Sequence, residues 1–216
     1  KTTLSEGMLY KSGTLRKLGA VDKGTAYLDS DDLEKKRGIT IFSHVACIQT
    51  GNSELQILDT PGHIDFAQEM EETLSVLDYA ILVVSASEGV TGYTRTLWSL
   101  LKKHQIPVFI FVNKMDTLKA DKENILKQLN ELDDNFIEFD NQDEDFYEKV
   151  ATVDETTLDQ YLELGKIEDN AVKKLINKRK IFPVYFGAAL KLIGIDEFLS
   201  GLDKWTDGIK YPNDFG

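Results

Sequence analysis

A short polar motif, Asp59-Thr60-Pro61-Gly62-His63, directly follows an apolar stretch that ends at Leu58. An aspartate at the tip of a strand can hold Mg²⁺ through a water molecule, because this ion prefers oxygen ligands and keeps part of its hydration shell. Gly62 lacks a side chain, so its N–H can approach a phosphate closely. Taken alone, the motif is more often an aspartate cap and a proline turn that open the next helix.

A second motif, Asn113-Lys114-Met115-Asp116, follows the apolar run 106–112. The Asp116 carboxylate can accept the N1–H and 2-amino protons of guanine together, whereas adenine has neither donor and would leave the acid unpaired. The Lys114 stem can lie against the flat base, and Asn113 can join the base-binding loops by hydrogen bonds. A polar loop is the alternative, but two such motifs in order, each after a strand, make a chance match much less frequent.

Two further segments could complete a site for a metal-bound triphosphate. Lys1-Thr2-Thr3 leads into a predicted helix and matches the end of the phosphate loop G-x-x-x-x-G-K-[ST]. Its ammonium would lie on the β- and γ-phosphates, and the Thr2 hydroxyl would bind Mg²⁺ at the positive end of the helix dipole. In Arg37-Gly38-Ile39-Thr40, the Thr40 hydroxyl could complete the Mg²⁺ shell when a γ-phosphate is present. Each segment is weak alone, and the second, taken alone, is more often a polar loop before a strand.

A fifth segment, Gly187-Ala188-Ala189, follows the apolar run 181–186. Such small residues would let backbone N–H groups reach the O6 carbonyl of guanine. Glycine after a strand is usually only part of a turn, so this signal is weak by itself.

These motifs need a scaffold that brings their loops to one edge. Strands are predicted over 41–50, 54–58, 79–86, 106–112 and 181–186. Helices are predicted near 3–12, 65–77, 92–104, 119–131, 155–163, 168–179 and 195–204. The alternation predicts an α/β fold with a doubly wound, mostly parallel sheet and helices on both faces, in which ligands bind at the carboxyl ends of the strands. Pro183 cannot donate to a ladder, so we expect the last strand at an edge or end.

Composition limits the class of protein. The 216 residues are 42% hydrophobic and 29% charged with only four prolines, which excludes a disordered or fibrous chain. The formal net charge is −12, so the chain as a whole is not built to coat nucleic acid, and no DNA partner is expected. Nine acidic residues and no Lys or Arg lie between Glu131 and Glu148, which predicts a solvated surface insertion on a nearly neutral body. An RNA partner could still meet that body away from the insertion.

The apolar runs are too short to span a bilayer, and no signal peptide opens the chain. The single Cys47 cannot form an internal disulfide, which fits a reducing compartment. We therefore expect a cytoplasmic protein with no membrane partner.

Together the five segments resemble the guanine-nucleotide domain of the translational GTPases, in which His63 after the glycine is typical. The resemblance runs from Lys1 to about Trp205. Residues 12–25 and 29–40 are similar to the tetracycline-resistance ribosomal protection proteins, relatives of elongation factor G. It implies a P-loop NTPase G domain over 1–205, an inserted acidic and helical subdomain within about 117–180, and an exit over 206–216 to further domains.

The resemblance also implies a role for each motif residue. Mg²⁺ would be held by Thr2, Thr40 and Asp59. The phosphates would be bound by Lys1, Thr2, Thr3 and Gly62. Guanine would be read by Asn113, Lys114 and Asp116, with Ala188 and Ala189 supporting. His63 would orient or activate the attacking water, so the expected activity is GTP hydrolysis to GDP and phosphate, stimulated when large-subunit RNA of the ribosome places that histidine.

Two departures from the family pattern leave alternatives open. Ala188 stands where the family usually has serine, which removes one hydroxyl. The strand and glycine-rich phosphate cradle that precede the lysine in the family are absent before Lys1, so we expect a trimmed start. Besides a monomeric ribosomal protection GTPase, the sequence therefore allows a translocase domain of the elongation factor G type or a non-catalytic interaction module with a GTPase fold.

Overall fold

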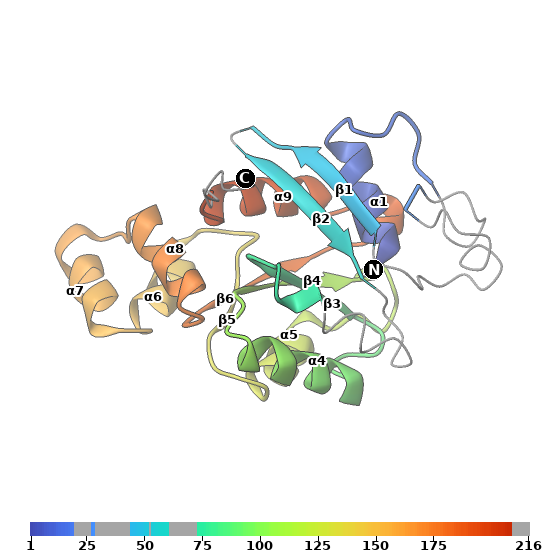
Figure 1. Ribbon diagram of the computed structural model, residues 1–216. Coiled ribbons are helices and arrows are strands. Elements are labelled where there is room, and N and C mark those ends of the chain that lie inside the picture. Colours follow the sequence, from blue (N-terminus) through green and yellow to red (C-terminus); the bar gives the residue numbers. More distant parts are fainter. Residues whose placement is uncertain (20–26, 29–43, 52, 61–72, 209–216) are drawn as a thin grey trace.

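A four-stranded parallel sheet forms the centre of the protein (Figure 1). The computed structural model describes residues 1–19, 27–28, 44–51, 53–60 and 73–208. The strand order is β3 (Ala80–Ser85), β4 (Val108–Asn113), β6 (Phe182–Phe186) and β5 (Phe136–Glu138). All six residues of β4 are buried, as expected for a nearly continuous apolar run with neighbours on both sides.

One face of the sheet packs against α1 (Thr2–Lys11) and α9 (Ile195–Trp205). Phe109 and Phe111 of β4 point to this face, and the Phe111 ring lies 5.0 Å from the ring of Phe198 in α9. The same layer holds Met8 and Leu9 of α1, both without appreciable exposure. The helix that follows Lys1 is thereby fixed to the sheet by burial of apolar area.

The opposite face is covered by α4 (Gly92–Lys103) and α5 (Lys122–Asn130). Trp98 of α4 packs on the Phe182 ring at 4.7 Å between centroids. Helices therefore cover both faces of a parallel sheet, which confirms the doubly wound α/β fold class (Figure 1).

A separate antiparallel hairpin contacts α1 and consists of β1 (His44–Gln49) and β2 (Glu54–Asp59). His44 pairs with Asp59, so the end of β2 lies beside the start of β1. The turn is attached to α9, because Thr50 Oγ1 donates a hydrogen bond of 2.5 Å to Asp203 Oδ1. Both predicted strands are found, although 41–43 lie outside the described residues.

The expectation that the strand containing Pro183 lies at a sheet edge is wrong, because β6 lies between β4 and β5. Its pairing with β4 begins one residue later, at Val184 opposite Ile110. On the other side, Phe182 N–H donates to the Asn135 carbonyl and Val184 accepts from Phe139 N–H. Pro183 therefore occupies a position where the missing N–H removes no bond to β5, so an interior strand tolerates it.

Two elements in the acidic run were not predicted: β5 and α6 (Glu144–Ala151). The acidic side chains of this run are exposed or half-buried, as a solvated insertion requires, but the run also contributes Phe136, Phe139 and Phe146 to the core, which the prediction missed. Acidic side chains are interspersed with apolar ones that face inward. The number of charges in the run therefore does not reveal its amphipathic pattern. The predicted helix over 65–77 falls mainly outside the described residues.

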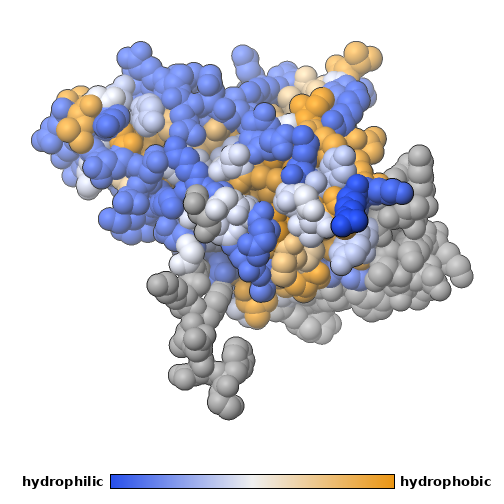
Figure 2. All heavy atoms as spheres, turned by 90° about the horizontal axis from the view of Figure 1, so that it is seen from above, coloured by the Kyte–Doolittle hydropathy of each residue, from blue (hydrophilic) through white to orange (hydrophobic). Residues whose placement is uncertain are grey.

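The helices α6, α7 (Glu155–Leu164) and α8 (Asp169–Asn177) form a group at the left of Figure 1. Figure 2 shows a mostly hydrophilic surface over this group, with hydrophobic side chains at its outer end. Three leucines of α7 are exposed: Leu158, Leu162 and Leu164. Among the described residues no helix combines the length and apolarity needed to cross a membrane.

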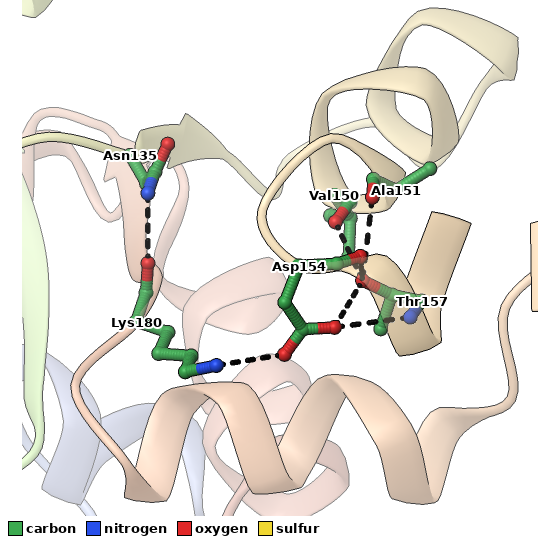
Figure 3. A network of polar contacts seen from close by, with 6 residues as sticks. All are labelled: Asn135, Val150, Ala151, Asp154, Thr157 and Lys180. Carbon is green, nitrogen blue, oxygen red and sulfur yellow. Dashed lines mark hydrogen bonds and ion pairs between the residues drawn. The ribbon is translucent and has the colours of Figure 1, made fainter. Parts of the chain in front are cut away.

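A polar network joins these helices to the segment before β6 (Figure 3). Asp154 caps α7: its Oδ1 accepts hydrogen bonds from the backbone N–H and the hydroxyl of Thr157, at 3.0 and 2.9 Å. Its Oδ2 accepts from Lys180 Nζ at 2.9 Å. The hydrogen bond from Lys180, followed by that from the Thr157 N–H, lowers the pKa of Asp154 to about 2.

This network predicts how stability depends on Asp154. The Asp154→Ala substitution should lower the free energy of unfolding by about 1 kcal/mol, because α7 loses its cap. Asp154→Asn keeps a capping side chain and loses only the ion pair, so its loss should be smaller. Urea unfolding at neutral pH measures both.

The pH dependence gives a second readout for the same variants. The pKa of Asp154 is lower in the folded protein than its ordinary value of 3.8. Its ionised form therefore adds stability above that value, and this contribution is lost as the pH falls towards 2. The difference between wild type and Asp154→Asn should shrink over that range, and a difference that grows on acidification would contradict the assignment.

Candidate functional site

One end of the candidate site lies where α1 begins and β2 ends. Lys1 immediately precedes α1, and Asp59 is the last residue of β2. Lys1 Nζ lies 3.4 Å from Asp59 Oδ1 and donates to Thr60 Oγ1 at 3.5 Å. The structure therefore brings together the motif that begins at Lys1 and the motif that begins at Asp59, which are far apart in the sequence. Both motifs belong to the predicted site for phosphate and metal.

Asp59 has the chemistry expected of a group that faces a cation. It is only 2% exposed, and neither carboxylate oxygen accepts a hydrogen bond from the described residues. A buried carboxylate whose cationic neighbour stands at 3.4 Å is costly unless a further positive group or hydrated ion satisfies its lone pairs. This orphaned acid fits Mg²⁺, which prefers carboxylate and water oxygens.

The helix start supplies donors at the same place. Leu4 and Ser5 donate their N–H groups to the Lys1 carbonyl, so the first turn is well formed. Thr2 and Thr3 lie within this first turn, at the positive end of the helix dipole. Thr2 is buried and Thr3 half-buried, so both lie against the protein rather than in open solvent.

Three predicted residues of this end, Thr40, Gly62 and His63, lie outside the described residues, as does Arg37. Their roles stay predictions.

The other end of the candidate site is built on the Asn113 side chain, at the carboxyl end of β4. Asn113 is 8% exposed, and its Oδ1 accepts hydrogen bonds from Lys114 N–H at 2.8 Å and from Ala189 N–H at 2.9 Å. The second bond joins the loop after β4 to the loop after β6. Met115 N–H adds a parallel bond to the Gly187 carbonyl at 3.0 Å, so two loops distant in sequence act as one unit.

Backbone geometry explains the residue types in these loops. Lys114 has a positive φ of 65°, which turns the chain sharply after β4. A Cβ on Gly187 would clash with the Ile193 carbonyl and the Phe111 ring, so only glycine lets the backbone pass so close. Ala188 and Ala189 follow in the same tight loop and are buried.

The prediction that the N–H groups of Ala188 and Ala189 are available for guanine O6 needs correction. Ala188 N–H donates to the Ile193 carbonyl at 3.0 Å, and Ala189 N–H donates to Asn113. Both groups are used to close the loop and attach it to β4. Their contribution in this structure is therefore to hold the loop that faces Asp116.

Asp116 lies on the exposed side of the same loop pair. Its Oδ2 is 2.8 Å from Nζ of Lys191, which follows Ala189 by two residues. The hydrogen bond from Lys191 is the largest cause of a lowered pKa of the Asp116 carboxyl, which keeps the group ionised. Sequence reasoning missed Lys191. This lysine lies two residues after the Gly187-Ala188-Ala189 motif, but nothing in the sequence shows in which direction its side chain points.

The helix α1 connects the two ends. A Cβ on Gly7 would lie 3.8 Å from the Ala189 carbonyl oxygen and would clash with the Ile195 side chain. The helix that begins just after Lys1 therefore packs directly on the loop that Asn113 holds. In Figure 1 the arrowheads of β2 and β4 point to the side where the N-terminus lies.

A separate hollow of about 230 Å³ between the β3–α4 loop and α5 contains none of the predicted site residues.

One family model matches nearly the whole chain. The model described as the elongation factor Tu GTP binding domain matches residues 1–207. The chain belongs to this family of GTP-binding domains.

The GTP-binding domain is similar to two kinds of tetracycline resistance protein. It is 37% identical over 216 residues to tetracycline resistance protein TetM of Ureaplasma urealyticum, covering 92% of this chain and 34% of the relative. It is 35% identical over 228 residues to tetracycline resistance protein TetP of Clostridium perfringens, covering 94% of this chain and 35% of the relative. The chain thus spans about a third of the length of these relatives.

A crystal structure of a protein from Thermus thermophilus shares the fold of this GTP-binding domain. The TM-score is 0.85 at 22% identity, over 96% of this chain and 38% of the other. The likeness supports the doubly wound fold and not a particular activity.

The two bonds accepted by Asn113 predict a large effect of its removal. Asn113→Ala should lower the free energy of unfolding by about 1–3 kcal/mol, because it leaves the buried N–H of Ala189 without its acceptor. Asn124→Ala, on the exposed face of α5, is the matched control and should stay within about 0.5 kcal/mol of wild type. Equal stabilities of the two variants in urea unfolding would show that the bond between the loops contributes nothing.

Proposed function

We propose that this domain binds GTP with Mg²⁺, hydrolyses it to GDP and phosphate, and acts on the ribosome as a switch of the ribosomal protection type. The observation that carries the proposal is that α1 contacts both ends of the candidate site. Lys1 and Asp59 meet at the start of α1, and the body of α1 packs on the loop that Asn113 joins to the Asp116 loop. Such a layout suits a ligand with a base at one end and phosphates at the other.

Base selection would rest on the Asp116 carboxylate. An ionised acid accepts the two N–H donors on one edge of guanine, and adenine offers neither. Only the ionised form accepts both bonds, and the ion pair with Lys191 favours that form. Lys114 would lie against the base, while Asn113, Ala188 and Ala189 would keep the two loops together.

The phosphates would be bound by Lys1, Thr3, the Gly62 N–H and the start of α1. Thr2, Thr40 and Asp59 would hold Mg²⁺, which when bound neutralises charge on the phosphate oxygens. The Asp59 carboxylate oxygens, which accept no hydrogen bond from the described residues, support this assignment.

Hydrolysis would depend on positioning rather than on a covalent intermediate. His63 would orient or activate the attacking water, and ribosomal RNA of the large subunit would place that histidine. The similarity to proteins named for tetracycline resistance favours the protection branch over a translocase. We further propose a monomeric, cytoplasmic protein, an inserted subdomain within about 117–180, and an exit to further domains over 206–216.

Binding is tested on the full-length protein by titrating a fluorescent GDP analogue and competing with GDP or ADP. The proposal expects competition by GDP and little by ADP. Phosphate release from GTP is then followed with and without ribosomes, and an increase with ribosomes is expected. Equal competition by GDP and ADP would overturn the base assignment, and binding without any release of phosphate would favour a non-catalytic module.

The Asp116→Asn substitution should move base preference from guanine towards xanthine. An amide donates where the carboxylate only accepts, and xanthine has a carbonyl in place of the 2-amino group of guanine. Competition between GDP and xanthosine diphosphate measures the change, with Asp121→Asn on the neighbouring helix cap as control. An unchanged preference would remove Asp116 from base recognition.

The His63→Ala substitution should leave GDP binding intact and abolish the stimulation of phosphate release by ribosomes. The reason is that the side chain would act on the attacking water and not on the bound nucleotide. His104→Ala, at the C-terminus of α4, is the control histidine variant. Normal stimulated turnover in His63→Ala would exclude the histidine from the reaction.

A further inference from the structure

The loop after β4 and the loop after β6, here called the guanine loops, are also joined by an exposed ion pair. Lys191 Nζ contacts Asp116 Oδ2 at 2.8 Å, and the two side chains are 58% and 28% exposed. The buried link through Asn113 joins the same two loops. The carboxylate proposed to read guanine is therefore already held by a cation from the facing loop.

The backbone directs Lys191 towards this acid. Lys191 ends the single turn η3 (Ala189–Lys191), in which its N–H donates to the Ala188 carbonyl at 2.9 Å. Leu192 then adopts a left-handed conformation with φ of 60°, which ends the turn. Because Ala189 is anchored to Asn113, the position from which the lysine extends is set by the guanine loops themselves.

In the loop after β6, the side chain that donates to the Asp116 carboxylate is that of Lys191. Ala188 has no hydroxyl, and Gly187 and Ala189 have no polar side-chain atoms, so these three residues offer Asp116 no side-chain donor. Among the described residues, Lys191 is the cation paired with Asp116. A carboxylate has about four lone-pair positions, so an ammonium on one oxygen leaves room for two donors from a base.

We propose that Lys191 is a specificity-determining residue of the guanine site, which fixes the orientation of the Asp116 carboxylate so that both of its oxygens face the base. This inference rests on the proposed function. Two simultaneous bonds need the carboxylate plane to be aligned with the base, whereas one bond tolerates rotation. Lys191 should therefore matter more for guanine than for hypoxanthine, which lacks the 2-amino group.

The test compares the binding of GDP and of inosine diphosphate by the Lys191→Met and Lys191→Arg variants of the full-length protein. Lys191→Met should weaken GDP binding about threefold, the size expected for a partly exposed ion pair, and should weaken inosine diphosphate binding less. Lys191→Arg should restore the wild-type preference, because a guanidinium can donate to the same oxygen. Lys119→Met, which removes an exposed lysine of the neighbouring segment, controls for the loss of one positive charge.

Two results would overturn the inference. Equal weakening of both nucleotides in Lys191→Met would indicate a structural role of the lysine in the loop, and tighter GDP binding would indicate that Lys191 competes with the base. Failure of the proposed function is distinct, because the wild-type protein would then not prefer GDP to ADP at all.

Discussion

The hydrogen bond from Ala189 N–H to the Asn113 side chain is the interaction on which the guanine half of the site depends. Asn113 ends β4, a strand in which all six residues are buried, so its position is fixed by apolar packing on both faces. Its buried amide oxygen holds the start of its own loop and the loop after β6 at once. Because leaving a buried donor unpaired is costly, the two loops remain together in the absence of a ligand.

Charge is distributed differently at the two ends of the candidate site. At the phosphate end a buried carboxylate, Asp59, stands beside one lysine at 3.4 Å and accepts no hydrogen bond from the described residues. At the base end an exposed carboxylate, Asp116, is closely paired with Lys191. The first arrangement leaves lone pairs for a hydrated cation, and the second keeps an acid ionised for neutral N–H donors. Both would be positioned by α1, which extends from Lys1 to the packing contact beneath Ala189.

The sequence predicted the parts of this site that follow from local pattern. Apolar runs with polar ends identified β4 and β6 and put Asn113 and Gly187 at their carboxyl ends, because parallel strands buried on both faces need such runs. Contacts between residues distant in the sequence could not be predicted from local pattern. The interior place of Pro183 depends on which neighbour each N–H faces, and the core role of Phe139 and Phe146 was hidden by surrounding acids. The partner of Asp116 depends on a lysine rotamer that no spacing encodes.

The most direct test is an experimental structure of the chain, with its natural flanking sequence, bound to GDP and Mg²⁺. The account predicts one nucleotide whose guanine edge meets the Asp116 carboxylate and whose β-phosphate lies beside Lys1, with the metal on the Asp59 side. A nucleotide bound elsewhere, or one that reaches the surroundings of only one of these two carboxylates, would contradict the claim that α1 joins two halves of a single site.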